Sequence, residues 1–273
     1  MGKFYGILIC SDLDGTLLRD DKSISRENLD AIEAFRAEGG AFTFITGRMP
    51  FYVSDTLNAL GRDVPFGCIN GGGIYDPKEG KYLWTQEPLS PRVLDILDYA
   101  EEKMPETGFQ INTFERLYFC KQTEAQERFR RVTGVPPLLC HHRKVPAPMA
   151  KVIFVDSPEG IDCLAALLAA HPLSAEFDLV RSAPTLFEIL GRGINKGTLI
   201  PKMAEIFGTT VEKTVAVGDY DNDIGMLRAA GVGVAVANAI PEAKAAADHV
   251  TVSNEEHAIA AIIRDIENGK IHI

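Results

Sequence analysis

Short apolar segments, each ending at a cluster of polar residues and leading into a helical pattern, constrain this chain most. Residues 4–10 form the first segment and residues 41–45 the second, with a helical pattern between them that begins near the candidate N-cap Ser25. Apolar runs without polar alternation are typical of strands buried on both faces of a parallel sheet. Strands of this kind alternating with helices predict an α/β fold with a Rossmann-like parallel-sheet core.

The middle of the chain has a different pattern. Residues 115–120 alternate polar and apolar side chains, as in a sheet with one exposed face, and helical patterns occur at residues 90–103, 124–133 and 159–170. After Pro184 the first pattern returns with an apolar strand at residues 186–190. We therefore expect residues 1–84 and 186–273 to form the parallel-sheet core and residues 85–185 to form an inserted α+β domain.

Charge and cysteine content narrow the class of protein. The formal net charge is -10, and the basic run His141-His142-Arg143-Lys144 is short, so a surface that follows a nucleic-acid backbone is not expected. The five cysteines are scattered without a Cys-x-x-Cys pair, which favours a reducing cytoplasmic location. No run of about 18 apolar residues occurs, so we expect no membrane span.

Two carboxylates follow the first strand directly. Asp12 and Asp14 lie two positions apart, a spacing at which both can contact one divalent cation. The adjacent Gly15 would let the backbone approach an anion closely. Taken alone, the same residues could form an ordinary solvated turn, because Asp, Gly and Thr all favour turns.

A hydroxyl and a lysine occupy comparable positions elsewhere. Thr46-Gly47-Arg48 comes just past the second strand, where the hydroxyl and backbone N–H groups could hold a phosphate oxygen. Lys196 lies in the first turn of a predicted helix, an end at which the helix dipole disfavours a cation. This placement suggests a bound anion nearby, although a solvated lysine or a simple helix cap would fit each segment alone.

A second acidic cluster follows the apolar strand at residues 214–217. Asp219 comes first after the strand and is the better metal ligand, whereas Asp221 or Asp223 could cap the helix that begins at Ile224. Because the carboxyl ends of parallel strands share one edge of a sheet, we expect these groups to meet. Carboxylate and phosphate oxygens suit Mg²⁺, so the chemistry indicated is phosphoryl transfer.

In this order and spacing, the four motifs resemble those of the haloacid dehalogenase-like hydrolase superfamily, specifically its Cof-type phosphatases with a large inserted cap domain. The matching residues are Asp12-Leu13-Asp14-Gly15-Thr16-Leu17, Thr46-Gly47-Arg48, Lys196, and Gly218-Asp219 with Asn222-Asp223, supported by Asn70-Gly71 and Asn238-Ala239. The resemblance spans essentially the whole chain and implies that residues 85–185 form the cap that selects the substrate.

The resemblance implies a role for each of these residues. Asp12 would attack phosphorus to give an aspartyl-phosphate, and Asp14 would protonate the leaving alkoxide and later deprotonate water. Mg²⁺ would be held by the carboxylates of Asp12 and Asp219 and the backbone carbonyl of Asp14, with Asp223 adjusting the shell. The phosphate and substrate contacts would come from Leu13, Thr46, Gly47, Arg48, Lys196 and Asn222.

The resulting hypothesis is a Mg²⁺-dependent phosphomonoester hydrolase. Its expected partner is a small phosphorylated metabolite, with sugar phosphates ahead of nucleotides and pyridoxal phosphate, and its expected state is a monomer or homodimer. A phosphomutase of the same superfamily and a receiver-type signalling domain that holds an aspartyl-phosphate remain alternatives. A dinucleotide oxidoreductase is disfavoured because no Gly-x-Gly-x-x-Gly follows the first strand.

Overall fold

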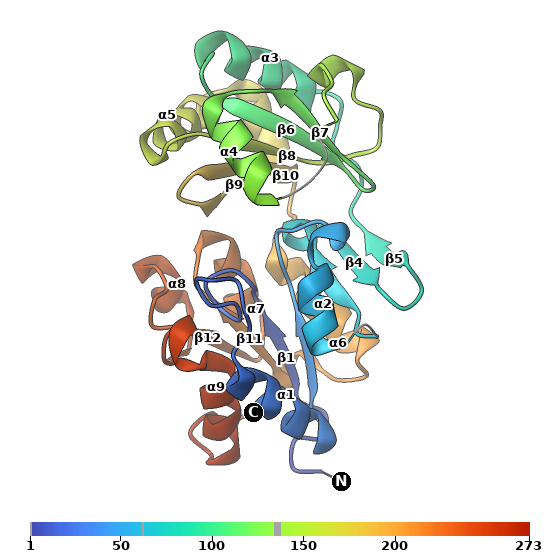
Figure 1. Cartoon of the computed structure of the whole chain (residues 1–273), viewed down its shortest axis with the longest axis vertical. Coiled ribbons are helices and arrows are strands. Elements are labelled where there is room, and N and C mark those ends of the chain that lie inside the picture. Colours follow the sequence, from blue (N-terminus) through green and yellow to red (C-terminus); the bar gives the residue numbers. More distant parts are fainter. Residues whose placement is uncertain (1, 62, 134–137) are drawn as a thin grey trace. The chain divides into compact units, whose positions relative to one another are not determined.

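The computed structural model describes residues 2–61, 63–133 and 138–273, and the chain divides into two compact units. Unit 1 consists of Met1–Thr85 together with Asn195–Ile273, and unit 2 consists of Gln86–Ile194. Figure 1 shows the two, with unit 1 containing both chain ends. Each has its own sheets and helices, so the fold class predicted for the chain, a parallel α/β core with an inserted α+β domain, is confirmed.

Unit 1 is built on a five-stranded parallel sheet with the order β13-β12-β11-β1-β2. Its strands are β1 (Leu8–Ser11), β2 (Ala41–Phe44), β11 (Thr214–Gly218), β12 (Val232–Ala235) and β13 (His249–Val250). Every residue of β1, β11 and β12 is buried, which explains their continuous apolar sequences. The strand predicted at residues 4–10 begins only at Leu8, because Gly6 has a φ of 81° in the preceding turn.

The helices of unit 1 follow the sequence signals closely. They are α1 (Arg26–Ala37), α2 (Ser54–Leu60), α6 (Ile200–Ile206), α7 (Ile224–Ala229), α8 (Pro241–Ala246) and α9 (Ala258–Glu267). Ser25 is the N-cap of α1, as predicted, and its Oγ accepts a hydrogen bond from the Asn28 backbone N–H. The segment from Phe51 to Leu60, closed by Gly61, predicts one helix. The structure instead has a separate 3₁₀ turn, Pro50–Tyr52, followed by α2.

A small antiparallel sheet also belongs to unit 1. It has the order β3-β4-β5, with β3 at Phe66–Cys68, β4 at Gly73–Asp76 and β5 at Lys81–Thr85. The alternation of strands and helices also predicts a third parallel strand at residues 66–69. The strand is present, but its place in the parallel sheet is wrong. A single parallel bridge, Ile45 to Gly67, links β3 to the chain that follows β2, whereas its ladder is with β4.

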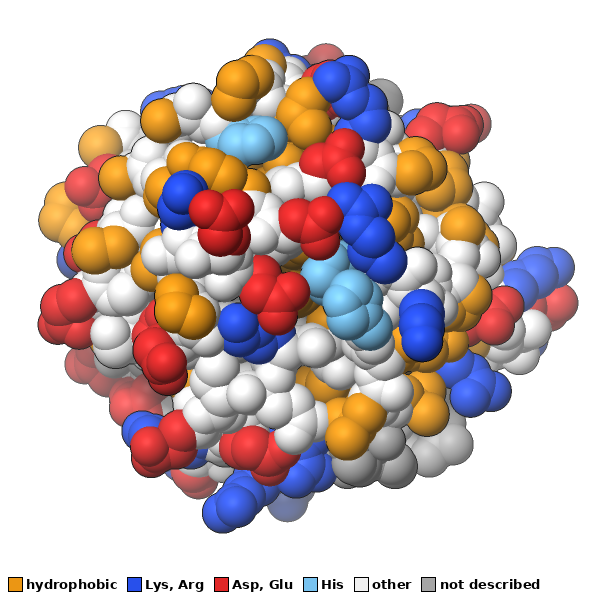
Figure 2. Space-filling model, turned by 90° about the horizontal axis from the view of Figure 1, so that it is seen from above, with side chains coloured by type: hydrophobic (Ala, Val, Ile, Leu, Met, Phe, Trp, Pro, Cys, Tyr) orange, Lys and Arg blue, Asp and Glu red, His pale blue; other side chains and the backbone are white. Residues whose placement is uncertain are grey.

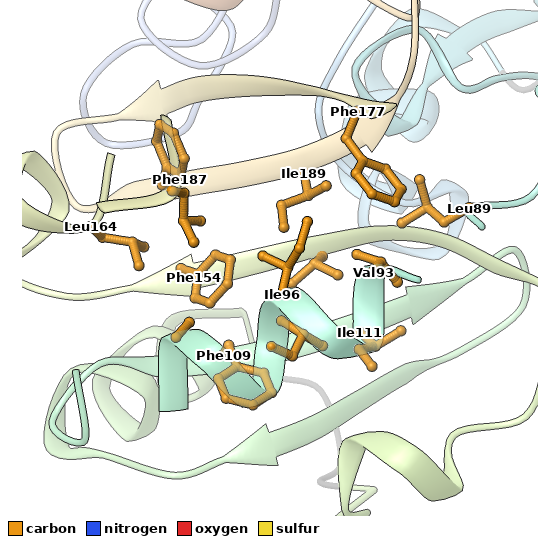
Figure 3. Close-up of a cluster of buried hydrophobic side chains, with 14 of the residues drawn as sticks. Leu89, Val93, Ile96, Phe109, Ile111, Phe154, Leu164, Phe177, Phe187 and Ile189 are labelled. Carbon is orange, nitrogen blue, oxygen red and sulfur yellow. The ribbon is translucent and has the colours of Figure 1, made fainter. Parts of the chain in front are cut away.

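Unit 2 is a five-stranded antiparallel sheet with helices. The strand order is β7-β6-β8-β10-β9, and the elements are α3 (Val93–Lys103), β6 (Gly108–Thr113), β7 (Leu117–Lys121), α4 (Glu124–Thr133), β8 (Met149–Val155), α5 (Pro158–Ala169), β9 (Phe177–Ala183) and β10 (Leu186–Gly191). In Figure 3, Ile96 of α3 lies among Phe154 and Ile189 of the sheet, in the buried cluster that forms the core of this unit. The helix predicted at residues 124–133 is confirmed.

The chain re-enters unit 1 later than expected. The sequence pattern assigns the strand at residues 186–190 to the parallel sheet, but as β10 it pairs antiparallel with β8 and β9. Residues 186–194 therefore belong to unit 2. The run Leu186-Phe187-Glu188-Ile189-Leu190 is apolar enough for either sheet, so the pattern alone does not decide the partner.

None of the helices in the described ranges has the length and apolar character that a membrane span needs. Acidic and basic side chains are interspersed on the face drawn in Figure 2, and among its described residues no continuous basic patch forms.

Candidate active site

Polar side chains from three neighbouring strands of unit 1 meet at one edge of the parallel sheet. Asp12 follows the last residue of β1, Asp219 follows the last residue of β11, and Thr46 comes two positions after the end of β2. Because β1 pairs in parallel with both β11 and β2, these strand ends lie side by side. The common edge expected from the sequence is confirmed.

Lys196 joins this edge from a 3₁₀ turn, Lys196–Leu199, whose N-cap Asn195 accepts a hydrogen bond from the Gly197 backbone N–H. Its Nζ lies 2.5 Å from Asp12 Oδ1 and 2.6 Å from Asp223 Oδ1, and its side chain is only 1% exposed. Burial alone would lower the pKa of Lys196, but the two carboxylates outweigh burial and raise it. The lysine is therefore a buried, charged ammonium between two acids.

Three carboxylates converge around that ammonium. Ligand oxygens of Asp12, Asp219 and Asp223 all lie within 4.8 Å of one another. Burial raises the pKa of Asp12 well above its usual value, against the effect of Lys196, and the two other acids add to the rise. Burial and Asp223 likewise raise the pKa of Asp219 to about 7. One lysine thus leaves negative charge uncompensated, and a divalent cation that prefers oxygen ligands would fit these donors.

Hydrogen bonds fix the orientation of the acids. Thr16 Oγ1 donates to Asp219 Oδ1 at 2.7 Å, and Asp223 Oδ2 accepts from the backbone N–H groups of Asp219 and Tyr220 at 2.9 and 3.0 Å. One oxygen of Asp223 accepts from these amides and the other contacts Lys196. Asp223 therefore fixes the turn after β11 and does not face solvent. Thr16 lies inside the first motif, yet no role for it follows from the sequence, because its partner is 203 positions away.

The side chain of Asp14 is held by two cations and is not part of the cluster of three acids. Its Oδ2 accepts from Arg48 Nε at 2.9 Å, while its Oδ1 accepts from Arg48 Nη2 at 2.7 Å and from Lys22 Nζ at 3.0 Å. Burial would raise the pKa of Asp14, but these two cations together lower it below the usual range. Sequence reasoning missed Lys22, which carries no motif signal of its own. The predicted metal contact of Asp14 is through its backbone carbonyl and stays a prediction.

The second motif and the residues next to it complete the candidate active site. Thr46 is buried, and its Oγ1 accepts a hydrogen bond from the Arg48 backbone N–H at 3.2 Å. Asn222 Nδ2 donates to Asn70 Oδ1 at 3.0 Å, which joins the last motif to the turn after β3. Gly71 has a φ of 102°, and a Cβ there would lie 2.1 Å from the carbonyl oxygen of Asn195. The glycine therefore lets that turn pack against the segment that carries Lys196.

Two further predicted phosphate contacts can involve only the backbone. The Leu13 side chain is fully buried, so only its main chain could reach an anion. Gly47 has no side chain, and a Cβ there would approach Asn70 Oδ1 to 2.9 Å. These positions suit the roles expected of their N–H groups, which remain predictions.

The basic run at residues 141–144 lies in unit 2, and two of its side chains contact acidic residues of α3. His142 Nε2 lies 2.6 Å from Asp98 Oδ1, and Arg143 contacts both Asp95 and Asp98 of α3. From the sequence, the run could be an anion contact or a solvated loop. Its His142 and Arg143 instead tie the turn to α3.

The fold and the site together define a phosphatase-type hydrolase: a parallel sheet whose carboxyl edge carries buried acids, a buried lysine and a threonine hydroxyl. The sequence model of the haloacid dehalogenase-like hydrolase family matches residues 9–263, so the chain belongs to that family. This membership confirms the predicted class of enzyme and excludes the receiver-type domain and the dinucleotide oxidoreductase.

Individual relatives match along nearly the whole chain. It is similar to phosphatase YwpJ of Bacillus subtilis, with 30% identity over 285 residues that cover 95% of this chain and 99% of the relative. It is also similar to the pyridoxal phosphate phosphatase YbhA of Escherichia coli, with 28% identity over 279 residues that cover 94% and 97%. A solved haloacid dehalogenase-like hydrolase from B. subtilis has a TM-score of 0.79 and 28% identity, covering 94% of this chain and 98% of that one.

Proposed function

We propose that this protein is a Mg²⁺-dependent phosphomonoester hydrolase with Asp12 as its nucleophile. The observation that carries the proposal is the position of Asp12, which shares Lys196 with Asp223 and lies within ligand distance of Asp219. A buried carboxylate between an ammonium and a metal-ligand group is suited to attack an anionic ester. The ammonium of Lys196 and a bound Mg²⁺ would both offset the charge of the phosphoryl group.

The reaction would have two steps. In the first, a carboxylate oxygen of Asp12 bonds to phosphorus and the bond from phosphorus to the ester oxygen breaks. Asp14, which would take up a proton once Arg48 contacts the phosphate in its place, gives that proton to the leaving alkoxide. In the second, Asp14 takes a proton from water, whose oxygen attacks phosphorus, so that inorganic phosphate leaves and Asp12 is regenerated. Asp14 lies two positions from the nucleophile with a side chain that is 43% exposed, as a group that exchanges protons with substrate and water requires.

The remaining groups would bind charge. Asp12, Asp219 and the backbone carbonyl of Asp14 would hold Mg²⁺, with Asp223 orienting that shell. Bound Mg²⁺ would neutralise part of the charge that develops on the transferring phosphoryl group. The ammonium of Lys196 would also neutralise part of this charge. The phosphate would be oriented by Thr46, Asn222, Arg48 and the N–H groups of Leu13 and Gly47.

The proposed substrates are small phosphorylated metabolites, with sugar phosphates first and phosphorylated cofactors next. The E. coli relative is named for pyridoxal phosphate, which supports the second group. We assign the selection of the substrate to unit 2, the inserted domain of Gln86–Ile194. A cytoplasmic location and a monomeric or dimeric state remain predictions from the sequence.

The test is release of inorganic phosphate from a panel of phosphomonoesters. We expect turnover with Mg²⁺, loss of turnover with EDTA and recovery when Mg²⁺ is added back. Asp12→Asn should remove the activity without unfolding the protein, whereas the matched control Asp30→Asn, on the exposed face of α1, should keep it. Near-normal turnover of Asp12→Asn would refute the nucleophile. Transfer to a sugar hydroxyl without phosphate release would favour a phosphomutase.

A further inference from the structure

Lys22 reaches the acid/base candidate from a tight turn at residues 19–23. The Arg19 backbone N–H donates to the Ser23 carbonyl, and the Lys22 backbone N–H donates to the Arg19 carbonyl, both at 2.9 Å. Asp21 Oδ1 accepts from the backbone N–H and the hydroxyl of Ser23. The turn is therefore closed by its own hydrogen bonds.

The same turn is fastened to a distant segment of unit 1. Arg19 Nη2 lies 2.8 Å from Glu255 Oε2, and the Asp20 backbone N–H donates to Glu255 Oε1 at 2.8 Å. Asn254 Nδ2 donates to the carbonyl of Leu18 at 3.1 Å. Lys22 is thus presented from a fixed backbone even though its own side chain is 58% exposed.

The backbone of Lys22 is strained. Its φ is 67°, in the left-handed region, which is unfavourable for any residue with a Cβ and which glycine adopts freely. Strained residues in a folded protein cluster at functional sites. Within the described part of the chain, the Lys22 side chain forms one ion pair, with Asp14 at 3.0 Å. A lysine at this position therefore adopts an unfavourable backbone conformation and places its ammonium on the acid/base candidate.

Asp14 has two cationic partners that differ in what they could do during a reaction. Arg48 contacts both carboxylate oxygens, and Lys22 contacts Oδ1 alone. Arg48 is also a proposed ligand of the substrate. When its guanidinium turns to the phosphate, Asp14 would lose both of its contacts with Arg48, and Lys22 would be the cation that still fixes Oδ1.

We propose that Lys22 is a positioning residue that holds Oδ1 of Asp14 so that Oδ2 is directed at the leaving-group oxygen. The proton then passes from Oδ2 to the alkoxide in the first step and returns to Oδ2 from water in the second, while Oδ1 keeps accepting from Lys22. This inference rests on the proposed function, because it requires Asp14 to act as the acid/base of a phosphatase.

Two aryl phosphates that differ only in a nitro group test the proposed role of Lys22. 4-Nitrophenyl phosphate has a good leaving group that needs little protonation, whereas phenyl phosphate has a poor one that depends on the general acid. We expect Lys22→Gly to lower kcat/KM for phenyl phosphate about tenfold, a fraction of the full effect of a general acid. The loss for 4-nitrophenyl phosphate should be much smaller. Lys22→Arg should restore the wild-type ratio of the two values.

The unfolding temperature of the variant distinguishes a positioning role of Lys22 from a role in stability. Glycine accepts the left-handed backbone, so Lys22→Gly should unfold at a midpoint temperature no lower than wild type. His257→Gly is the matched control, because His257 also has a positive φ, 63°, and its ring lies 3.6 Å from Glu27 instead of next to Asp14. We expect this control to leave the ratio of the two esters unchanged.

The possible failures are distinct. If Lys22→Gly lowers kcat/KM equally for both esters, or leaves both at wild-type values, the positioning role is overturned while the phosphatase stands. If the wild-type protein releases no phosphate with Mg²⁺ from any phosphomonoester, the proposed function fails and the role of Lys22 fails with it.

Discussion

The ammonium of Lys196 lies 2.5 Å from Oδ1 of Asp12, across 184 positions of sequence. Both side chains are almost completely buried, and Asp219 and Asp223 lie close by. Without a metal, one positive charge faces three carboxylates. The stability of this site, its response to pH and its affinity for Mg²⁺ should therefore all depend on how that charge is balanced.

Replacing Lys196 tests the charge balance of the site directly. In Lys196→Met the three acids lose their ammonium, and we expect the free energy of unfolding in EDTA to fall by about 3 kcal/mol, because removing one partner leaves buried charge without compensation. Phosphatase activity should be lost as well. Urea unfolding with EDTA and with Mg²⁺ measures the effect, and Mg²⁺ should stabilise the variant more than the wild type.

Lys78→Met is the control for that substitution, because Lys78 is exposed in the turn between β4 and β5. Its stability and activity should match the wild type. A Lys196→Met protein that unfolds at the wild-type urea concentration in EDTA would contradict the proposed charge balance.

The raised pKa of Asp219 predicts how pH acts on the metal-free protein. Its pKa of about 7 in the folded state lies above the value of 3.8 of an unperturbed aspartate. Between about pH 4 and pH 7 the folded state keeps a proton that the unfolded state has lost. The free energy of unfolding should therefore fall as the pH rises through this window, and the loss should be complete above about pH 7.

Mg²⁺ binding should show the opposite trend. The cation must displace the Asp219 proton, so its affinity should rise at least about tenfold per pH unit up to about pH 7, where Asp219 loses that proton. Calorimetric titration between about pH 5.5 and pH 8 measures this. Thr16→Val removes a hydrogen bond that lowers the pKa of Asp219, so the rise should move to higher pH. An affinity independent of pH in both proteins would refute the assignment.

Gly15 should tolerate no side chain. It has a φ of 81°, and a Cβ there would lie 2.6 Å from Oδ2 of Asp219. We expect Gly15→Ala to displace that carboxylate and to weaken Mg²⁺ binding at least about tenfold, the lower end of what loss of ligand orientation costs. Gly208→Ala separates strain from the clash, since Gly208 has a φ of 66° with open space around it. That control should lose stability but keep its affinity for Mg²⁺.

Much of the site follows from sequence because of one physical rule. Parallel strands place their carboxyl ends on one edge, so the strand pattern alone predicts that Asp12, Thr46 and Asp219 meet there. The capped helix α1 is equally predictable, since Ser25 and its hydrogen bond to Asn28 are local. Features that depend on neighbours in sequence, or on the common edge of parallel strands, are therefore predictable.

Features that depend on which particular strand or side chain a residue contacts are not predictable from the sequence pattern. The sequence pattern assigns β10 to the wrong sheet, because an apolar run does not identify the strand with which it will pair. The contacts of Lys22 with Asp14 and of Thr16 with Asp219 depend on a backbone torsion and on a 203-residue separation, respectively. Neither leaves a periodic signal in the sequence.

A buried ion pair in unit 2 is also not predictable from the sequence pattern, and it is the basis of the last prediction. Lys151 of β8 and Glu188 of β10 approach to 2.7 Å with side chains 1% and 3% exposed, and Ser182 donates to the other oxygen of Glu188 at 2.6 Å. Lys151→Met removes the ammonium that faces the buried carboxylate. We expect the free energy of unfolding to fall by about 3 kcal/mol in urea titrations of the full chain.

The double variant Lys151→Met with Glu188→Leu distinguishes the pair from simple packing. It removes both charges, and an apolar replacement of a buried pair is often neutral, so most of the lost stability should return. Lys103→Met is the matched control, because its pair with Glu102 is exposed and should contribute less than about 1 kcal/mol. If the double variant is no more stable than Lys151→Met, the loss comes from the volume and shape of the lysine side chain, and the charge of Glu188 is not what destabilises the single variant.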